Sequence, residues 1–474
     1  MSLTPELSPK PRLLIVGGGY AGFHVARELQ KKVAERGGVV TVVDPRPYMT
    51  YYPFLPEVVG GHIEGRHVNV DLQTHLKDAE VVRGAVVSVD HAGRTAVVRG
   101  EGGDEFEIPY QDIVMTAGAV TRVFPIPGLG EQGIGLRSVE EAVQLRNQIL
   151  ERLDAGSLMT DAEERKRALT FVVVGGGFAG IEAIAEMENL IRNAVERNER
   201  LSQSEIRIVL VEAMGRIMPE VSEEQAQGVV EHLKDRGIEV LLNTSLGDAT
   251  DGIMTLVDMK DKSEKEKFGA DTLVWTAGVA ANGVAKQTDF PVEQRGRIEV
   301  TPTLQVKDGE SGVLEGAWGC GDVCAVPDLT GSGPGGFCVP NAQHAVRQAK
   351  QLAANYMAVR HGEGEVAEYV HKSLGAVAGL GFLKGVGNPM GLKINGVPAW
   401  LAHRGYHIYA MPTLERRFRI ASGWIAETLF GRDTTSVSGQ DTPFNAFRAA
   451  AGVELEPARF EQRERDTAQA EPAI

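Results

Sequence analysis

The sequence predicts an α/β fold, because an apolar strand, a glycine-rich turn and a helical segment follow one another at two separate places. The first unit runs from the strand Arg12–Val16 into the turn at 17–22, and the second runs from Phe171–Val174 into the turn at 175–180. A further apolar strand that ends in an acidic residue follows each unit. Strands joined through a helix lie parallel, so we expect two parallel sheets with helices packed on them.

The first glycine-rich turn has the spacing of a dinucleotide fingerprint, Gly-x-Gly-x-x-Gly, between a strand and a helix. Gly17 permits the tight turn, and Gly19 lets the backbone approach a pyrophosphate. Gly22 lets the helix pack closely on the strand, and the helix N-terminus points its amides at the anion. Asp44 ends the next apolar strand, where a carboxylate is placed to accept a hydrogen bond from a ribose hydroxyl.

The second turn repeats this pattern in full. Gly175, Gly177 and Gly180 occupy the three glycine positions, and the strand Ile206–Val211 ends in Glu212. An acid there accepts from the free 2′-hydroxyl of NADH and repels the 2′-phosphate of NADPH, so we expect a preference for NADH. The alternative for the repeat is two unrelated glycine turns. The alternative for Glu212 is an acid that ends a strand in solvent. The recurrence of the whole unit favours two Rossmann-like domains that bind two dinucleotides.

Composition limits the remaining classes of protein. The 474 residues carry a formal net charge of −15, which repels phosphate backbones, so we expect no nucleic-acid partner. The only cysteines are Cys320, Cys324 and Cys338, which favours a reducing compartment. The N-terminus lacks the apolar segment of a secretory signal, and no apolar run is long enough to span a bilayer. We therefore expect a cytoplasmic protein with at most peripheral membrane contact, and no metal is implied.

Three later segments resemble motifs of the flavoprotein reductases that have two dinucleotide-binding domains. They are Thr116-Ala117-Gly118-Ala119 and Trp275-Thr276-Ala277-Gly278, each after an apolar strand, and an apolar strand that ends in Gly321-Asp322. In that family the first two are crossover turns, and the aspartate of the third binds the ribityl hydroxyls of the flavin. An ordinary turn residue is the alternative for Asp322. The resemblance implies FAD as the first cofactor and NADH as the second.

The resemblance also implies a discontinuous FAD-binding domain with the NADH-binding domain inserted into it. We expect the FAD-binding domain over residues 1–140 and 290–375, and the NADH-binding domain over 150–285. The charged segment Glu151–Arg167 is expected to be a polar linker into the second domain. Two facing domains would bring nicotinamide C4 and flavin N5 to near-contact distance for hydride transfer.

The positions of the cysteines argue against two other branches of this superfamily. Disulfide reductases of this superfamily carry a redox-active cysteine pair near a nucleotide domain, and the first 319 residues here contain no cysteine. Sulfide:quinone oxidoreductases normally carry one before residue 200, and it is also missing. Cys320 and Cys324 are expected to be small buried residues rather than redox centres.

The segment after Val339 resembles the Ala-Gln-x-Ala-x-x-Gln motif of type II NADH dehydrogenases, the single-subunit NADH:quinone oxidoreductases. Here the motif begins at Ala342 and ends at Gln348, with Asn341 where the family commonly has threonine. In that family the motif opens a helix against the flavin and lines the quinone entrance, which implies a catalytic role for Gln343. A generic amphipathic helix with both glutamines in solvent is the alternative.

Two more positions match that family. The counterpart of Tyr48–Val58 runs beside the flavin ring and the quinone, which implies that Pro53 contacts FAD. Glu182 matches a glutamate near the nicotinamide and the flavin, which is proposed to position the nicotinamide or to relay protons. The alternative for Glu182 is a plain acid in the first turn of a helix, where the helix dipole favours it.

These motifs give the residues expected to contact the two dinucleotides. For FAD they are Gly17, Gly19, Tyr20, Ala21, Gly22, Asp44, Pro53, Thr116, Ala117, Gly118, Gly321, Asp322, Ala342 and Gln343. For NADH they are Gly175, Gly177, Phe178, Ala179, Gly180, Glu182, Glu212, Ala277 and Gly278.

The C-terminal region differs in charge from the rest of the chain. Residues 371–433 hold eight basic and three acidic residues, a local charge of +5. Apolar residues recur there at helical spacing, at Leu414, Phe418, Ala421, Ile425 and Leu429, with Trp424 beside them. A basic helix with an apolar side is typical of an interfacial anchor on anionic lipid, and a helix packed on its own domain or in a dimer interface is the alternative. We expect a membrane-association region over 376–433 and a polar tail over 434–474.

Taken together, the sequence predicts an FAD-dependent oxidoreductase that passes hydride from NADH to FAD and two electrons to a membrane quinone, without pumping protons. The expected partners are NADH, menaquinone or ubiquinone, and the anionic inner face of the cell membrane, and a homodimer is an open alternative. Three rival readings share the nucleotide motifs: a soluble NADH:acceptor reductase, a sulfide:quinone oxidoreductase, and a redox-sensing protein without catalysis.

Overall fold

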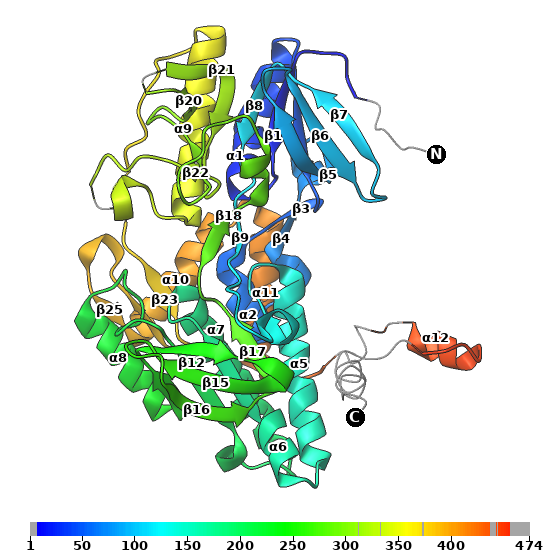
Figure 1. Ribbon diagram of the computed structural model, residues 1–474, viewed down its shortest axis with the longest axis vertical. Coiled ribbons are helices and arrows are strands. Elements are labelled where there is room, and N and C mark those ends of the chain that lie inside the picture. The colour runs from blue at the N-terminus through cyan, green and yellow to red at the C-terminus, as the bar shows by residue number, and fades with distance from the viewer. Residues whose placement is uncertain are drawn as a thin grey trace. The chain divides into compact units, whose positions relative to one another are not determined.

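The computed structural model describes residues 7–455, apart from 311, 332, 372–373, 437–441 and 443 (Figure 1). The chain divides into two compact units, each assembled from separate stretches of sequence. Unit 1 comprises Met1–Tyr51, Val68–Arg122 and Gly278–Leu374, and unit 2 comprises Tyr52–His67, Val123–Ala277 and Gly375–Ile474. The predicted α/β fold with two Rossmann-like sheets is confirmed, and each unit contains one of the sheets.

Unit 1 is built on an eight-stranded sheet. In spatial order its strands are β20 (Gln305–Asp308), β21 (Gly312–Gly319), β8 (Asp112–Met115), β1 (Arg12–Val16), β2 (Val39–Asp44), β5 (Ala79–Asp90), β6 (Thr95–Gly100) and β7 (Glu105–Pro109). The strands from β21 to β5 pair in parallel, and antiparallel strands extend both edges. Every residue of β1 is buried, as expected for a central parallel strand. Helix α1 (Tyr20–Glu35) follows β1 and packs against α9 (Ala342–His361), as Figure 1 shows.

Unit 2 is built on a five-stranded parallel sheet. In spatial order its strands are β10 (Gly133–Ile134), β17 (Thr272–Trp275), β11 (Thr170–Val174), β12 (Arg207–Val211) and β13 (Ile238–Leu241). A second, antiparallel sheet consists of β14 (Thr244–Asp248), β15 (Ile253–Asp258) and β16 (Glu264–Gly269). Apolar residues of the two sheets form one core cluster, in which Leu246 and Leu256 meet Val172 and Trp275.

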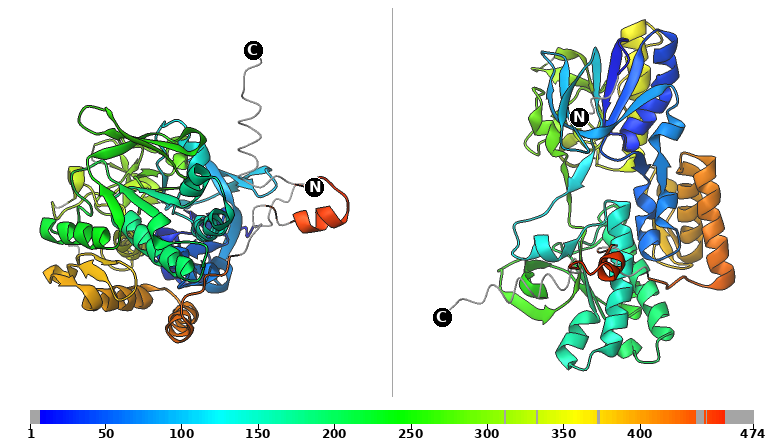
Figure 2. Two further views of the ribbon diagram at one scale, coloured as in Figure 1. Left: turned by 90° about the horizontal axis from the view of Figure 1, so that it is seen from below. Right: turned by 90° about the vertical axis from the view of Figure 1, so that its right-hand side faces the viewer.

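Unit 2 also contains several helices, which pack on its sheets and on one another. They are α2 (Leu55–Val59), α4 (Leu129–Gln132), α5 (Val139–Leu158), α6 (Ala162–Ala168), α7 (Phe178–Glu196) and α8 (Glu223–Asp235). The C-terminal region adds β23 (Val377–Gly379), β24 (Gly385–Gly387), β25 (Ile394–Asn395), α10 (Gly396–Ala410), α11 (Leu414–Phe430) and α12 (Asn445–Ala450). Helices α10 and α11, drawn in amber and orange, lie side by side (Figure 2).

Short elements complete the described part of the chain. In unit 1 they are β3 (Tyr48–Thr50), β4 (Asn69–Asp71), α3 (Leu72–His75), β9 (Ala119–Thr121), β18 (Val279–Ala281), β19 (Ile298–Glu299) and β22 (Cys324–Ala325). Strands β9 and β18 pair with each other in antiparallel fashion where the chain leaves and re-enters unit 1.

The predicted polar linker is wrong. The segment Glu151–Arg167 is helical over most of its length, because α5 continues to Leu158 and α6 begins at Ala162. Its exposed charged residues include Asp154, Glu163 and Glu164, whereas Arg165 and Arg167 form ion pairs with Glu205 and Asp271. Ile149 and Leu153 on the inner face of α5 are buried. An amphipathic helix with a polar outer face gives the same composition as a linker.

The observed units differ from the expected domain limits in several places. Residues 123–140, expected in the FAD-binding domain, group with unit 2, and residues 278–285, expected in the NADH-binding domain, group with unit 1. Residues 52–67 group with unit 2, because α2 packs against α5 and α7. The C-terminal region also groups with unit 2. Within the expected polar tail, the structure describes α12, whereas residues 437–441, 443 and 456–474 lie outside the described residues.

Candidate dinucleotide-binding sites

The turn between β1 and α1 has the geometry that the first fingerprint predicts. Gly17 has φ +97°, in the region that favours glycine. A Cβ on Gly22 would lie 1.7 Å from the carbonyl oxygen of Gly17, so only glycine lets α1 pack this closely. The N–H of Gly18 donates to Asp44 Oδ2 at 2.7 Å, and the N–H of Arg46 donates to Oδ1 at 2.7 Å. Burial raises the pKa of Asp44, although both hydrogen bonds favour its charged form.

The turn between β11 and α7 has the same construction. Gly175 has φ +118°, and a Cβ on Gly180 would lie 1.9 Å from the Gly175 carbonyl oxygen. The N–H of Gly176 donates to Glu212 Oε2 at 2.5 Å, and the N–H of Met214 donates to Oε1 at 2.7 Å. Glu212 is 9% exposed, which contradicts the alternative that it ends a strand in solvent.

Both turns leave room for a phosphate. The second glycines of the two fingerprints, Gly19 and Gly177, are the N-caps of α1 and α7, and a Cβ on either would meet no protein atom within 4 Å. A glycine N-cap has no side chain to satisfy the first amides of the helix, so these amides can bind an anion. The carboxylates of Asp44 and Glu212, each held by two backbone N–H groups, retain lone pairs that can accept from ribose hydroxyls. These groups fit a dinucleotide at each turn.

A threonine braces each turn from the neighbouring strand. Thr116 Oγ1 donates to the carbonyl oxygens of Val16 and Gly17, both at 2.9 Å. Thr276 Oγ1 makes the equivalent bonds to Val174 and Gly175, at 3.0 and 3.2 Å. Thr276 was not among the predicted contact residues, although the repeated Thr-Ala-Gly sequence is a signal that could have identified it.

The remaining crossover residues lie at these same turns. Ala117 lies under the first glycine turn, since a Cβ on Gly17 would be 2.8 Å from its Cα atom. Ala277 lies under the second, and a Cβ on Gly175 would be 3.0 Å from its nitrogen. Gly118 and Gly278 have φ values of +68° and +102°, which glycine adopts without strain. The residues between the glycines begin the two helices: Tyr20 and Ala21 in α1, and Phe178 and Ala179 in α7.

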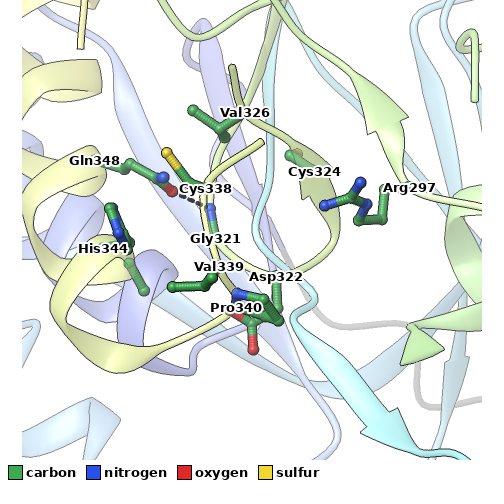
Figure 3. A pocket seen from close by; sticks show the side chains of 11 residues that line it. Arg297, Gly321, Asp322, Cys324, Val326, Cys338, Val339, Pro340, His344 and Gln348 are labelled. Carbon is green, nitrogen blue, oxygen red and sulfur yellow. Dashed lines mark hydrogen bonds between the residues drawn. The ribbon is translucent and has the colours of Figure 1, made fainter. Parts of the chain in front are cut away.

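A small pocket in unit 1 joins the third motif to the start of α9 (Figure 3). Gly321 and Asp322 line it together with Pro340, His344 and Gln348. The N–H of Gly321 donates to the buried side-chain carbonyl of Gln348 at 2.8 Å. A Cβ on Gly321 would lie 3.2 Å from the Cβ of Ala21, so this turn approaches the first fingerprint. The predicted flavin residues at 17–22 and 321–322 therefore come together.

The glutamine motif is fixed by tertiary contacts. Asn341 caps α9, because its side chain accepts from the N–H of His344 at 2.8 Å, and Ala342 is the first helical residue. Gln343 Oε1 accepts from the N–H of Leu374 at 3.3 Å and lies 2.8 Å from His371 Nε2. With Gln348 bound to Gly321, the alternative that places both glutamines in solvent is wrong.

The cysteines beside the third motif are buried, as predicted. Cys320 is 0% exposed and Cys324 is 4% exposed. Burial raises the pKa of both thiols far above neutrality, so the reactive thiolate form is suppressed. Neither side chain is suited to a thiol–disulfide step.

Glu182 is held by the C-terminal region within unit 2. Its Oε1 accepts from the N–H of Gly379 at 2.9 Å and lies 3.1 Å from Nε2 of His403 in α10. Burial disfavours the charged form of His403, but Glu182 outweighs this and raises the pKa of the imidazole. The side chain of Glu182 is 12% exposed, and it lies beyond the first turn of α7. The alternative of a plain first-turn acid is therefore wrong.

One turn further along α7, a buried charge cluster was missed by the sequence analysis. His62 Nε2 lies 2.6 Å from Glu186, and His62 Nδ1 lies 2.5 Å from Glu427 of α11. Arg432 lies 3.6 Å from Glu186 and 3.7 Å from Glu427. Burial opposes the charged imidazole, yet the two carboxylates raise the pKa of His62 to about 9. We call these four residues the α7–α11 charge cluster.

A second buried pair holds α2. Glu57 is 4% exposed, and its Oε2 accepts from the indole N–H of Trp424 at 2.7 Å and from Arg404 at 3.4 Å. The Arg404 guanidinium lies over the rings of Trp400 and Trp424, at 4.4 and 4.5 Å from their centroids. Pro53 lies in the turn Tyr52–Phe54 just before α2, and therefore in unit 2.

The other side of the C-terminal helices is apolar and faces solvent. On α11 the predicted stripe is exposed, with Leu414 at 79% and Phe418 at 76%. The exposed apolar face continues over both helices, at Val397, Leu401, Tyr409, Ile425 and Leu429. The opposite side of α11 holds the buried Ile420 and contacts the rest of unit 2 through Trp424, which donates to Glu57, and Glu427, which pairs with His62. Among the residues that the structure describes, no helix is long and apolar enough to cross a bilayer.

The pinned carboxylate of Glu212 gives a specific prediction. Glu212→Ala removes the negative charge that opposes a 2′-phosphate and the acceptor for a 2′-hydroxyl. We expect the preference for NADH over NADPH, measured as the ratio of the two kcat/KM values, to fall at least about tenfold, the value of one charge-assisted hydrogen bond. Glu199→Ala, at an exposed acid of unit 2, is the control. An unchanged ratio would contradict the assignment.

The geometry agrees with comparisons to known proteins. A family model described as pyridine nucleotide-disulphide oxidoreductase matches residues 11–349, so the chain belongs to that family. The type II NADH:quinone oxidoreductase of Mycobacterium tuberculosis is 24% identical over 448 residues, which cover 91% of this chain and 92% of the relative. The type II NADH:quinone oxidoreductase of Staphylococcus aureus is 27% identical over 397 residues, 82% of this chain and 92% of the relative. The predicted resemblance to type II NADH dehydrogenases is confirmed.

Solved structures show the same fold. The structure of NDH2 from Plasmodium falciparum in complex with NADH has a TM-score of 0.82 at 18% identity and covers 90% of this chain and 100% of that chain. The sulfide:quinone oxidoreductase from Aquifex aeolicus has a lower TM-score of 0.66 at 16% identity, with 91% of this chain and 99% of that chain covered.

Proposed function

We propose that this protein is an FAD-dependent NADH:quinone oxidoreductase. The observation that carries the proposal is the matched construction of the two glycine turns, each with an open N-cap glycine, a pinned carboxylate and a bracing threonine. We assign FAD to the turn of unit 1 and NADH to the turn of unit 2. When bound, FAD takes a hydride from NADH and passes two electrons to the acceptor.

The residues of the chain have separate tasks in this proposal. The amides of α1 and α7 bind the pyrophosphates, and Asp44 and Glu212 bind the riboses. Gly321 and Asp322 hold the ribityl side of the flavin, with Ala342 and Gln343 at the start of α9 beside them. Glu182 positions the nicotinamide or moves protons through its partner His403.

A quinone is the acceptor that the site supports best. Cys320 and Cys324 are buried, Cys338 is half-buried, and burial raises the pKa of all three thiols, so the thiolate needed for disulfide or sulfide chemistry is suppressed at each of them. The curated relatives named above carry the name NADH:quinone oxidoreductase. The quinone class, menaquinone or ubiquinone, enters near Gln343.

The exposed apolar face of α10 and α11 supports contact with the inner face of the cell membrane. An apolar helix face beside basic residues partitions into the headgroup region of anionic lipid. The alternative is that this face forms a homodimer. Sedimentation without lipid distinguishes membrane contact from dimerisation, because only a dimer would have twice the mass of the chain.

Anaerobic stopped-flow tests the proposed reaction. The flavin is reduced with NADH and then mixed with a short-chain menaquinone or ubiquinone analogue. Reoxidation much faster than by oxygen or a small dye is the expected result. Fast reduction followed by slow reoxidation with every quinone would instead favour a soluble acceptor and refute the quinone step.

Glu182→Gln tests the role of the α7 carboxylate. The amide oxygen can still accept from the N–H of Gly379, but the charge that pairs with His403 is lost. We expect quinone turnover to fall by about 10², the contribution of a positioned acid–base group, with unchanged FAD content. Glu196→Gln, at an exposed position of the same helix, is the control. Unchanged turnover would remove Glu182 from the mechanism.

A further inference from the structure

A groove of about 400 Å³ runs along unit 2 between α8 and the C-terminal strands β24 and β25. One side is a single face of α8 that includes Gly228 and His232. The other side is the chain from Leu380 to Gly396, which includes Lys384 and Lys393. The two sides are tied together, because the side chain of Gln225 donates to the carbonyl oxygen of Gly387 at 2.8 Å.

Positive charge gathers around this groove. Lys384 and Lys393 both line it. Gly396, which also lines it, is the first residue of α10, and the N-cap Asn395 makes no side-chain bond to the first amides of that helix. Glu224 also lines the groove and pairs with Lys393 at 2.6 Å, so it offsets one of the two lysine charges. Lys384 and the N-terminus of α10 leave the groove with a net positive charge, which favours an anion.

His232 adds a donor that the protein does not use. Its Nε2 atom is buried and has no hydrogen-bond partner among the described residues. Burial lowers the pKa of His232, and the positive charges of Arg236 and Lys384 lower it further, although Asp235 and Glu188 oppose them. A buried ring nitrogen without a partner is costly unless a ligand or water satisfies it.

Gly228 keeps the groove open. It lies in the middle of α8, where glycine is among the least favourable residues. A Cβ there would meet no protein atom within 4 Å, so the position has room for a side chain that the sequence does not provide. The missing side chain leaves space on the groove side of the helix.

The lysines alternate with exposed apolar residues. Phe382 and Leu383 directly precede Lys384, Leu392 precedes Lys393, and Val397 follows Gly396. These apolar side chains are all exposed, with Leu392 at 67%. Lysines beside exposed apolar residues are typical of a membrane interface, where the amine reaches a headgroup and the apolar residues enter the acyl region.

We propose that the groove binds the phosphate headgroup of one anionic phospholipid, with Lys384, Lys393 and His232 as donors and the N-terminus of α10 beside them. Its acyl chains would lie along Leu392 and Val397, next to the exposed apolar face of α10. This inference rests on the proposed membrane contact, and it adds the class of lipid that the protein would recognise. A soluble phosphate ester would offer the same headgroup chemistry without the apolar chains.

Vesicle flotation of the full-length protein tests the site. Vesicles of phosphatidylcholine alone are compared with vesicles that also contain phosphatidylglycerol. Wild type is expected to prefer the anionic vesicles. Lys384→Gln should reduce that preference about fivefold, the effect of one cation at the surface. Lys234→Gln is the matched control, because Lys234 is an exposed residue of α8 that does not line the groove.

Gly228→Leu is the decisive variant. It fills the groove without changing any charge, and leucine favours a helix, so the fold should be retained. We expect it to lose the preference for phosphatidylglycerol as Lys384→Gln does. The site is refuted if Gly228→Leu keeps the wild-type preference, or if Lys234→Gln weakens that preference as much as Lys384→Gln does. Either result would mean that the protein is attracted to anionic vesicles by its surface charge in general.

Two controls separate this proposal from the proposed function. Without lipid, Gly228→Leu should reduce a water-soluble quinone analogue at the wild-type rate. If wild type itself failed to reduce that analogue, the result would count against the proposed function and not against the lipid site. Wild type that binds both vesicles equally would refute only the lipid site. A third result would overturn the lipid proposal. If glycerol 3-phosphate raised the unfolding temperature of wild type but not of Gly228→Leu, and phosphatidylglycerol did not increase vesicle binding, the groove would bind a soluble phosphate.

Discussion

Gly177→Val is expected to raise the KM for NADH by about a hundredfold or more while the protein stays folded and keeps its flavin. Gly177 is the N-cap of α7, and its backbone is extended, with φ −73° and ψ 178°, which valine adopts easily. A Cβ there meets no protein atom, so the new side chain occupies only the space left for the pyrophosphate. Moving a bound group by about 1 Å is enough for an effect of this size.

Gly180→Ala, at the third glycine of the same turn, is expected to affect the fold as well as NADH binding. Gly180→Ala places a Cβ 1.9 Å from the carbonyl oxygen of Gly175, so α7 must move away from β11. We expect a loss of stability of about 1–3 kcal/mol, the usual cost of an overpacked contact, together with weaker NADH binding. Steady-state kinetics, flavin absorbance and thermal unfolding of both variants distinguish the two effects. A Gly177→Val protein with wild-type KM would refute the assignment of NADH to this turn.

The glycine turns could be predicted because their signals are local. Strand β8 falls at Asp112–Met115 and β1 at Arg12–Val16, as expected from the apolar runs. The acid at the end of the second strand, the turn and the crossover sequence all lie within one repeated unit of the chain. Each of them constrains the others, so the agreement among them was enough to predict the geometry of the turns.

The association of α2 with unit 2 could not be predicted in the same way. The apolar residues of α2 show that it is buried, but burial does not reveal the surface against which a helix packs. The resemblance to a family predicted that this segment runs beside the flavin, and it gave no information on the contacts of α2 with α5 and α7. Similarly, the charges of Glu151–Arg167 concealed the helical spacing of the buried residues in α5.

The α7–α11 charge cluster could not be predicted from the sequence, for a different reason. His62 and Glu427 are 365 residues apart, and each alone resembles an ordinary polar residue. Arg432 was counted only as part of a basic region, although it is buried. The basic charge of the C-terminal region therefore serves two purposes: Arg404 and Arg432 bind carboxylates inside unit 2, and other basic residues remain at the surface.

His62→Leu is expected to destabilise unit 2 by about 3–5 kcal/mol, the usual effect of removing one partner from a buried ion pair. The variant leaves Glu186 and Glu427 without their imidazole partner, and the charges of Arg432 and the more distant Arg404 balance them only in part. Because the cluster joins α7 to α11, we also expect the C-terminal helix to become sensitive to trypsin at Arg416 and Arg417. Urea unfolding followed by tryptophan emission is a suitable measure, since three of the four tryptophans (Trp275, Trp400 and Trp424) are in unit 2.

The pH dependence of stability identifies the cause. The carboxylates raise the pKa of His62 from an ordinary 6.5 to about 9, so the folded state holds the proton more tightly than the unfolded chain does. Its stabilisation, about 3 kcal/mol, is fully present below pH 6.5 and is lost as the pH rises through 9. Wild type should therefore lose stability between pH 6.5 and 9, whereas His62→Leu should lose much less over that range. His361→Gln, at an exposed histidine of α9, should keep the wild-type slope, and equal slopes for His62→Leu and wild type would show that this imidazole is not charged in the folded protein.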